Sequence, residues 1–293
     1  MLEEITLLMQ RLAFPQAAID ALTEIAKKLM EDETCYAEFR EILAQYEETA
    51  DCAYSQMFAR MKELSERLNI SEYEGAMLLL LAMCKKLRER YAARGLSDEL
   101  FYHTMADLRY KVVECYLLYG IHGTFVASWF WRFYKVDRFA FGRLQFEVIK
   151  LGVDCEYEGT KLSCDCNALN IHIPRTGTRL DHDEVLESYR LAKEFYKDFF
   201  RDQPTVFTCH TWLLYPWNET VLSPASNMYA FYKDFKIIAS GDYDTYKDAW
   251  RLFDCLFDGD ASKLPRDSSL RRAYADRIAN GEPTGWGHGI FVL

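Results

Sequence analysis

The chain has 293 residues, of which 50% are hydrophobic and 15% aromatic, and this composition supports a sizeable core and excludes a disordered chain. The formal net charge of −10 excludes a general affinity for nucleic acid, because the phosphate backbone repels an acidic surface. Nine cysteines, an odd number spread along apolar segments, favour reduced thiols in a cytoplasmic protein over a disulfide framework.

No segment of the sequence predicts secretion or membrane insertion. The first residues, MLEEITLL, are acidic and lack the basic start of a secretory signal. The longest uninterrupted apolar run, residues 76–84, is too short to cross a bilayer, which takes about 20 residues. We therefore expect a soluble, cytoplasmic protein that binds neither membranes nor nucleic acid.

Residues 1–120 predict an all-helical domain. Apolar residues recur at the spacing of one helix face, for example at Ile19, Leu22, Ile25 and Leu29. Ser71 and Glu74 form the sequence of a capping box that leads into the apolar run 76–84. This region contains no alternating strand pattern and no catalytic constellation, and its one histidine is His103.

An aromatic segment begins where the helical pattern ends, at Gly120. Its large side chains are Phe125, Trp129, Phe130, Trp131, Phe133, Tyr134, Phe139 and Phe141. Because aromatic side chains bury much area each, we expect the segment to pack between the helical domain and the rest of the chain. Stacking on a ligand is the alternative. We place the domain boundary between residues 120 and 121.

From Phe139 onward the sequence predicts strands alternating with helices. In the segment LQFEVI, Leu144 and Phe146 share one face of a strand, and Gln145 and Glu147 share the other. Glu147 is the best carboxylate candidate for a general base. An exposed or salt-bridged glutamate is the alternative interpretation.

Residues 169–200 predict a strand, a loop and a helix. Ile171 and Ile173 belong to an alternating apolar pattern that is typical of a strand. Asp181, followed three residues later by Glu184, predicts the start of a helix.

The loop of this segment is a candidate anion site. Arg175 and Arg179 flank Gly177, whose lack of a side chain permits a tight turn or the close approach of a ligand. The following helix N-terminus carries unpaired N–H groups, which attract phosphate. An ordinary turn with solvated arginines is the alternative.

The remaining segments complete an α+β pattern. The turn at Glu158 predicts a hairpin over residues 155–166, and Cys164 and Cys166 lack the second ligand pair of a zinc site, so we expect no metal. Further strands are predicted in TVFTCHTWLL, FKIIAS and the glycine-rich C-terminal segment, with helices between them. The fold class is therefore α+β, an all-helical N-terminal domain followed by a mixed, largely antiparallel sheet flanked by helices.

The order of these elements in residues 121–293 resembles that of the GNAT acyltransferase superfamily. A closer similarity, over nearly the whole chain, is to a bacterial family of acyltransferase-domain proteins with a helical N-terminal domain and a GNAT-like C-terminal domain. The stretches that carry it are GRLQFE, HIP with a following G-x-x-L, TWLL-x-P, SNM-x-x-F and GWGHGI.

The resemblance implies that the loop after the 169–173 strand binds the pyrophosphate of coenzyme A. On this sequence the matching positions are Arg175, Gly177, Arg179 and Leu180. The superfamily pattern, Gln/Arg-x-x-Gly-x-Gly/Ala, contains a second glycine, and this sequence has one glycine at a different spacing.

The resemblance also implies roles beyond this loop. Backbone N–H groups near Ile171 and Ile173 would bind the thioester carbonyl. Asn227 would contact the pantetheine, and Tyr232 would protonate the leaving thiolate. The segment is compressed relative to the superfamily pattern, and Asp234 stands where glycine is usual.

Together these features predict an acyl-CoA-dependent N-acyltransferase. It would move an acyl group from acetyl-CoA or another acyl-CoA to the amine of a small molecule or peptide. The candidates for the base that deprotonates this amine are Glu147, His172 and His210; for each histidine, a structural role is the alternative. A non-catalytic GNAT-like binding or interaction module is the second hypothesis. A hydrolase is disfavoured, because the sequence has no G-x-S-x-G, H-E-x-x-H or P-loop motif.

Overall fold

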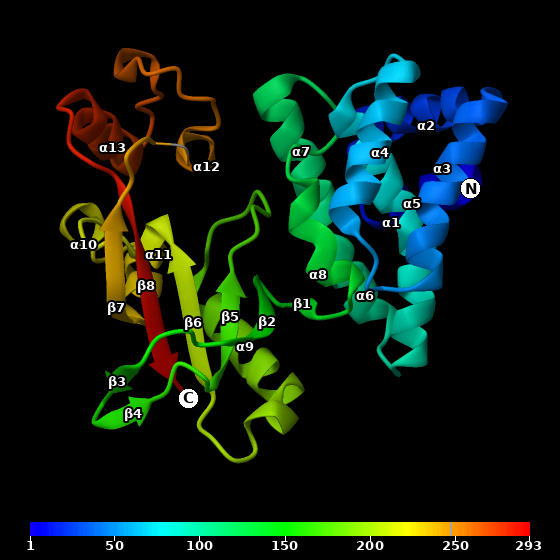
Figure 1. The fold of residues 1–293 in the computed structure, drawn as a ribbon. Helices are drawn as coiled ribbons and strands as arrows, with labels where there is room; N and C mark the ends of the chain where they lie inside the picture. The colour runs from blue at the N-terminus through cyan, green and yellow to red at the C-terminus, as the bar shows by residue number, and fades with distance from the viewer. Residues whose placement is uncertain (247) are drawn as a thin grey trace. The chain divides into compact units, whose positions relative to one another are not determined.

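The computed structural model describes residues 1–246 and 248–293 and divides the chain into two compact units, Met1–Phe139 and Ala140–Leu293 (Figure 1). The first unit is helical and the second is a mixed sheet with helices, so the predicted α+β class is confirmed. Among the described residues, no helix combines the length and the apolar character needed to cross a bilayer.

The first unit is built around a buried central helix. Its helices are α1 (Leu2–Arg11), α2 (Gln16–Glu31), α3 (Glu33–Glu48), α4 (Tyr54–Arg67), α5 (Glu72–Ala93), α6 (Asp98–Met105), α7 (Asp107–Tyr119), the 3-10 helix η1 (Ala127–Phe130) and α8 (Trp131–Tyr134). The predicted capping box starts α5, with the Ser71 N–H donating to Glu74 Oε2 over 2.9 Å. The apolar run 76–84 lies in α5, and seven of the nine side chains of this run are buried, as expected of a helical segment that is apolar all round.

The aromatic segment forms part of this helical core. The Tyr134 hydroxyl donates to Leu80 O on α5 over 2.6 Å, and the Tyr46 hydroxyl donates to Tyr134 O over 2.9 Å. Trp129 Nε1 donates to Asp107 Oδ2 on α7 over 3.0 Å. These contacts group residues 121–139 with the helices, so the compact units divide after Phe139, whereas the sequence pattern changes near residue 120.

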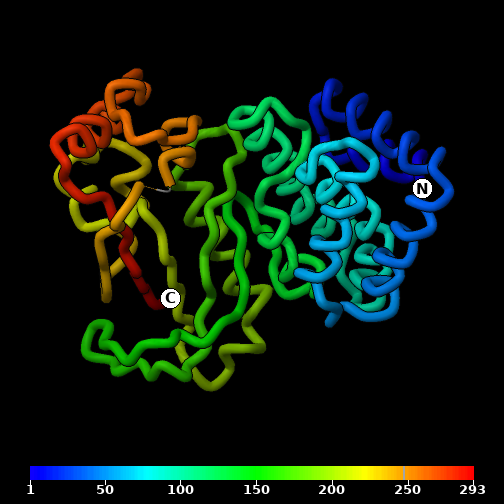
Figure 2. Tube along the Cα trace, turned by 45° about the horizontal axis from the view of Figure 1, so that its top comes forward, coloured from blue at the N-terminus to red at the C-terminus, as the bar shows by residue number. Residues whose placement is uncertain are grey.

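The second unit contains a six-stranded sheet in the order β1-β2-β5-β6-β8-β7. The strands are β1 (Arg138–Phe141), β2 (Leu144–Lys150), β5 (Asn167–His172), β6 (Val206–Thr211), β7 (Lys236–Asp242) and β8 (Gly285–Val292). The β2–β5, β6–β8 and β7–β8 pairs are antiparallel and the β5–β6 pair is parallel. The predicted hairpin forms a separate two-stranded sheet of β3 (Cys155–Tyr157) and β4 (Thr160–Leu162), which lies beside the end of β8 (Figure 2).

Helices complete the core of the second unit. They are α9 (His182–Phe195), η2 (Lys197–Phe200), η3 (Trp212–Leu214), α10 (Asn218–Val221), α11 (Asn227–Lys233), α12 (Ala249–Phe253), η4 (Ala261–Lys263) and α13 (Ser269–Ala279). Tyr189 of α9 packs its ring 5.5 Å from that of Phe207 and 4.8 Å from that of Phe291. Residues 169–200 thus form the predicted strand, loop and helix, and Asp181 caps α9.

The two parallel strands diverge at their C-terminal ends. The pairing of β5 with β6 extends only over Leu169↔Phe207 and Asn170↔Thr208, although the strands continue to His172 and Thr211. We call the gap beyond these pairs the strand opening. The segment between β7 and β8, which contains α12, η4 and α13, lies beyond this end of β6 and β7 (Figure 1).

Candidate active site

A row of polar side chains crosses the sheet face opposite α9. Strand residues directly opposite each other present their side chains on the same face. Glu147 is paired with Asn170, Asn170 with Thr208, and His210 with His288. The alternating partners, such as Phe146, Phe207 and Phe291, face α9. The row therefore passes directly beside the strand opening.

Glu147, Asn170 and His172 form a compact hydrogen-bonded group. His172 Nε2 lies 2.9 Å from Glu147 Oε1, and Asn170 Nδ2 donates to the same oxygen over 3.0 Å. Glu147 is only 3% exposed. A buried carboxylate needs such donors to remain ionised. In the tautomer that has its proton on Nε2, His172 donates to Glu147 Oε1 and the Nδ1 lone pair is left for a ligand.

Two of the three predicted base candidates are therefore hydrogen-bonded to each other. The prediction named Glu147 and His172 separately and missed Asn170, which lies two residues before His172 on the same face of β5. Asn170 Nδ2 is 3.1 Å from His172 Nε2, so the amide contacts both members of the pair. Asn170 could have been found from the period-2 alternation of the strand, which puts residues 170 and 172 on the same face.

His210, the third candidate, belongs to a second cluster on β6 and β8. Its exposed ring stacks on Trp286 at 4.4 Å between centroids and lies 6.0 Å from the ring of His288. His288 Nε2 is 2.7 Å from Thr208 Oγ1. Burial, and then the neighbouring His210, lower the pKa of His288, which keeps this imidazole neutral at pH 7.

The two histidines nearest the strand opening lie on the two strands that border it. Asn170 and Thr208 are partners in the parallel pair, and His172 and His210 each lie two residues further along their strands. Both side chains therefore belong to the polar face, one on each side of the opening.

The glycine-rich segment GWGHG sets the direction of Trp286 and His288. A Cβ atom on Gly287 would lie 1.9 Å from Leu214 O, and one on Gly289 would lie 2.7 Å from Phe235 Cβ. The alternating glycines thus allow η3 and the end of α11 to pack against one face of β8. The intervening Trp286 and His288 side chains are presented on the other face, a consequence that the sequence analysis missed.

The loop between β5 and α9 has the predicted glycine turn. The N–H groups at the start of α9, however, already have a hydrogen-bond acceptor within the chain. Gly177 has a φ of 82°, and a Cβ atom there would meet no other atom within 4 Å. The Asp181 side chain accepts hydrogen bonds from the N–H groups of Asp183 and Glu184. This carboxylate satisfies first-turn amides of α9 that would otherwise attract a phosphate.

The two predicted arginines of the loop differ in their surroundings. Arg175 Nη1 forms an ion pair with Asp254 Oδ1, with the arginine side chain 34% exposed. Arg179 is exposed, and its side chain forms no ion pair within the described part of the chain. The loop backbone is held by Arg143, which the prediction did not name: Arg143 Nη1 donates to Pro174 O over 2.8 Å, and Nε donates to Arg179 O over 3.4 Å.

The remaining predicted residues come from the α9 side of the sheet. Asn227 is the first residue of α11 and is half-buried. Tyr232 on the same helix is buried, and burial, followed by the nearby Glu219 carboxylate, raises its pKa. The α11 helix is tied to α9 by His182 Nε2, 2.9 Å from Asp234 Oδ1. Tyr232 and Asn227 thus start from the layer opposite the polar row.

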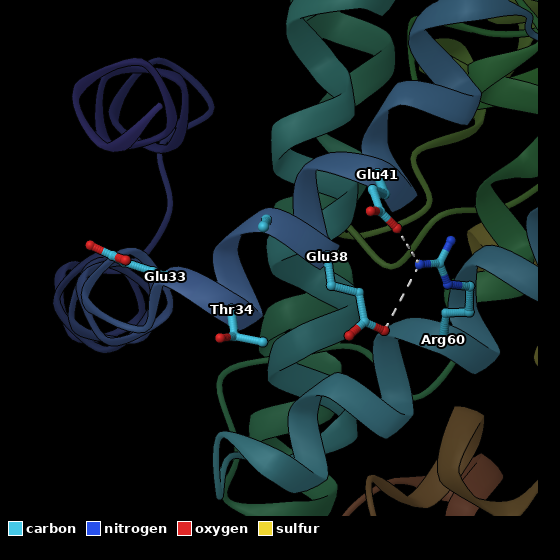
Figure 3. A pocket seen from close by; sticks show the side chains of 6 residues that line it. Glu33, Thr34, Glu38, Glu41 and Arg60 are labelled. Atoms are coloured by element: carbon cyan, nitrogen blue, oxygen red, sulfur yellow. Dashed lines mark hydrogen bonds and ion pairs between the residues drawn. The ribbon is translucent and has the colours of Figure 1, made fainter.

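A separate hollow on the first unit does not provide an anion site. It has a volume of about 500 Å³ and lies between α3 and α4 (Figure 3). The acidic side chains Glu33, Glu38 and Glu41 line it, and Arg60 Nη2 is engaged by Glu41 at 3.2 Å and by Glu38 at 3.9 Å. Its net negative charge would repel a phosphorylated ligand.

Solved structures with the same fold extend over both units. An acyltransferase in complex with decanoyl-CoA and teicoplanin is 20% identical and has a TM-score of 0.78. The match covers 99% of this chain and 88% of the acyltransferase chain. A mutant acyltransferase in complex with octanoyl-CoA gives the same values. An acyltransferase in complex with decanoyl-CoA is 19% identical over 98% of this chain and 86% of its own, with a TM-score of 0.73.

Family models cover both units as well. Residues 3–136 match the N-acyltransferase N-terminal domain, and residues 139–291 match the GNAT-like C-terminal domain. A comparison with curated proteins gives no match. The second model alone covers more than half of the chain, so this protein belongs to the N-acyltransferase family that joins a helical N-terminal domain to a GNAT-like C-terminal domain.

Proposed function

We propose that the acyl group passes from a CoA thioester to an amine at the strand opening, with Glu147 and His172 as the general base. The observation that carries this proposal is the group of Glu147, Asn170 and His172 on the polar face beside the opening. Acyl transfer to an amine requires a bound thioester, a base for the ammonium proton and donors for the developing oxyanion.

The strand opening supplies unpaired backbone for the thioester carbonyl. Cys209 Sγ on β6 donates to Ile171 O over 3.5 Å, so the Ile171 peptide faces β6. The N–H and C=O of one strand residue point to the same side, and pairing with β6 ends at Asn170. The Ile171 N–H takes part in the last pairing with β6, so the donor that we propose for the carbonyl oxygen and the oxyanion is the N–H of Ile173, two residues further on the same side of the chain.

The proton path follows from the hydrogen bonds of His172. The substrate ammonium loses a proton to Nδ1, and Glu147 stabilises the resulting imidazolium through Nε2–H. The amine nitrogen then bonds to the carbonyl carbon and the carbon–sulfur bond breaks. The nitrogen releases its second proton, which leaves the neutral amide and balances the proton that the thiolate takes up. We propose Tyr232 as the donor of that proton, since a tyrosine hydroxyl is protonated at neutral pH. His210, across the opening, would contact the incoming amine.

The CoA phosphates would be bound by the loop rather than by the end of α9. Asp181 already occupies first-turn amides of that helix. We therefore propose that the backbone of Gly177 and Leu180 and the exposed guanidinium of Arg179 bind the pyrophosphate, together with Arg175. Asn227, at the start of α11, would contact the pantetheine.

The donor that we propose is a medium-chain acyl-CoA rather than acetyl-CoA. Three structures of similar fold hold decanoyl-CoA or octanoyl-CoA, and the first also holds the glycopeptide teicoplanin. The acceptor that we propose is accordingly an amine on a small molecule or peptide of the glycopeptide type.

Calorimetric titration tests donor binding. We expect decanoyl-CoA to bind more tightly than acetyl-CoA, because additional buried CH₂ groups contribute about 0.8 kcal/mol each. Arg179→Ala should weaken binding about tenfold by removing a charge-assisted phosphate contact. Arg190→Ala is the matched control, since Arg190 is an exposed arginine on α9 that pairs with Glu187.

Two results would count against this function. If none of these thioesters binds at millimolar concentration, the proposed function fails. If decanoyl-CoA binds and no primary amine, teicoplanin included, increases the release of CoA thiol, the result favours the non-catalytic binding module.

A further inference from the structure

The segment between β7 and β8 is joined to the loop that follows β5 through one carboxylate. Asp254, which ends α12, accepts from Arg175 Nη1 at Oδ1 and from Arg271 Nη2 on α13, over 2.6 Å, at Oδ2. We call Arg175, Asp254 and Arg271 the Asp254 bridge. The proposed function gives a role to Arg175 and none to Asp254 or Arg271.

The Asp254 end of this bridge is rigidly held. Arg271 Nε donates to Leu252 O over 2.8 Å, and its Nη1 is 2.9 Å from Asp267 Oδ2. Asp254 itself has a left-handed backbone, with a φ of 59°, at the end of α12. The carboxylate is thus fixed both through its own backbone and through an arginine with three partners.

We propose that Asp254 is a positioning residue that holds the Arg175 guanidinium ready for a CoA phosphate. This inference rests on the proposed function, because it assumes that the loop binds CoA. Asp254 uses Nη1 of Arg175, and the side chain is 34% exposed, so its remaining N–H groups can reach a ligand. Fixing a flexible arginine before binding removes the entropy cost of ordering it in the complex.

The charges of the bridge also suit this role. An isolated carboxylate beside Arg175 would repel a phosphate as well as orient the arginine. Arg271 compensates, since two guanidinium groups and one carboxylate leave a net charge of +1 on the bridge. Asp267, the other acidic partner of Arg271, is 67% exposed, so water screens its charge.

The test compares Asp254→Asn with wild type on two donors, decanoyl-CoA and S-decanoyl-pantetheine, which lacks the nucleotide phosphates. Asparagine tolerates the left-handed backbone and removes only the charge. We expect the KM for decanoyl-CoA to rise about three- to tenfold with kcat unchanged, since phosphate binding is remote from the reacting bond. The KM for the pantetheine thioester should stay the same.

Four further variants separate positioning from stability. Arg175→Ala should raise the KM for decanoyl-CoA at least as much, and adding Asp254→Asn to it should have no further effect. Asp267→Asn is the matched control, because it removes a partner of Arg271 that does not contact Arg175. Asp254→Glu should restore part of the loss.

Several outcomes would overturn the inference. An unchanged or lowered KM for decanoyl-CoA in Asp254→Asn would mean that Asp254 does not orient Arg175 for the phosphate. An equal rise of the KM for both donors would indicate a structural defect. If wild type binds no acyl-CoA at all, the proposed function fails, and that result is distinct from each of these.

Discussion

Replacing Glu147 by glutamine is expected to lower kcat for acyl transfer by about 10²- to 10⁴-fold. The substitution keeps the shape of a side chain that is 3% exposed. It removes the negative charge that stabilises His172 when this residue takes the ammonium proton, and the amide can also favour the wrong imidazole tautomer. Rates of CoA thiol release, with decanoyl-CoA and a panel of primary amines, measure this effect.

The same variant should bind the donor normally. Glu147 is not among the residues that we propose for the phosphates, so the Kd for decanoyl-CoA should change less than about twofold. The matched control is Glu156→Gln, which makes the same substitution at an exposed position on β3. A Glu147→Gln enzyme with wild-type kcat would exclude the carboxylate from the proton path.

Gly287→Ala should produce the largest loss of stability among single-methyl changes in the sheet. The new Cβ atom would lie 1.9 Å from Leu214 O and 2.4 Å from Leu214 C, and both contacts are with backbone of η3. Neither β8 nor η3 can shift without breaking its neighbours' contacts, so we expect a loss of roughly 3 kcal/mol in the free energy of unfolding. Urea denaturation followed by tryptophan fluorescence measures it.

Gly177→Ala is the matched control for this substitution. Gly177 has a φ of 82°, and its surroundings are open, so alanine meets only backbone strain of about 1–2 kcal/mol. A Gly287→Ala protein that is no less stable than Gly177→Ala would mean that η3 does not pack against β8 as closely as described. The Trp286 and His288 side chains would then need another explanation for their direction.

Local patterns predicted most of the fold. The alternation in LQFEVI and around Ile171 identified β2 and β5, Asp181 identified the start of α9, and Ser71 with Glu74 identified the start of α5. These features depend on neighbours within a few residues, which a sequence displays directly. The aromatic segment before Phe139 was harder, because its packing against α5 and α7 depends on residues far away in the chain.

The site was predicted in parts, and the missing parts are long-range contacts. Glu147 and His172 were both named, yet their joining depends on the register of β2 against β5, which no local pattern specifies. The hydrogen bond of Asn170 to Glu147 depends on the same register. The link between Arg175 and Asp254 joins segments far apart in the chain, and the packing of η3 against β8 depends on a close approach of two backbones.

A crystal structure of the protein with decanoyl-CoA tests the central claim most directly. Our account predicts the thioester carbonyl oxygen within hydrogen-bonding distance of the Ile173 N–H, with His172 beside it on the polar face and the pyrophosphate against Gly177 and Arg179. A thioester outside the opening between β5 and β6, or a pyrophosphate away from the loop that precedes α9, would contradict it.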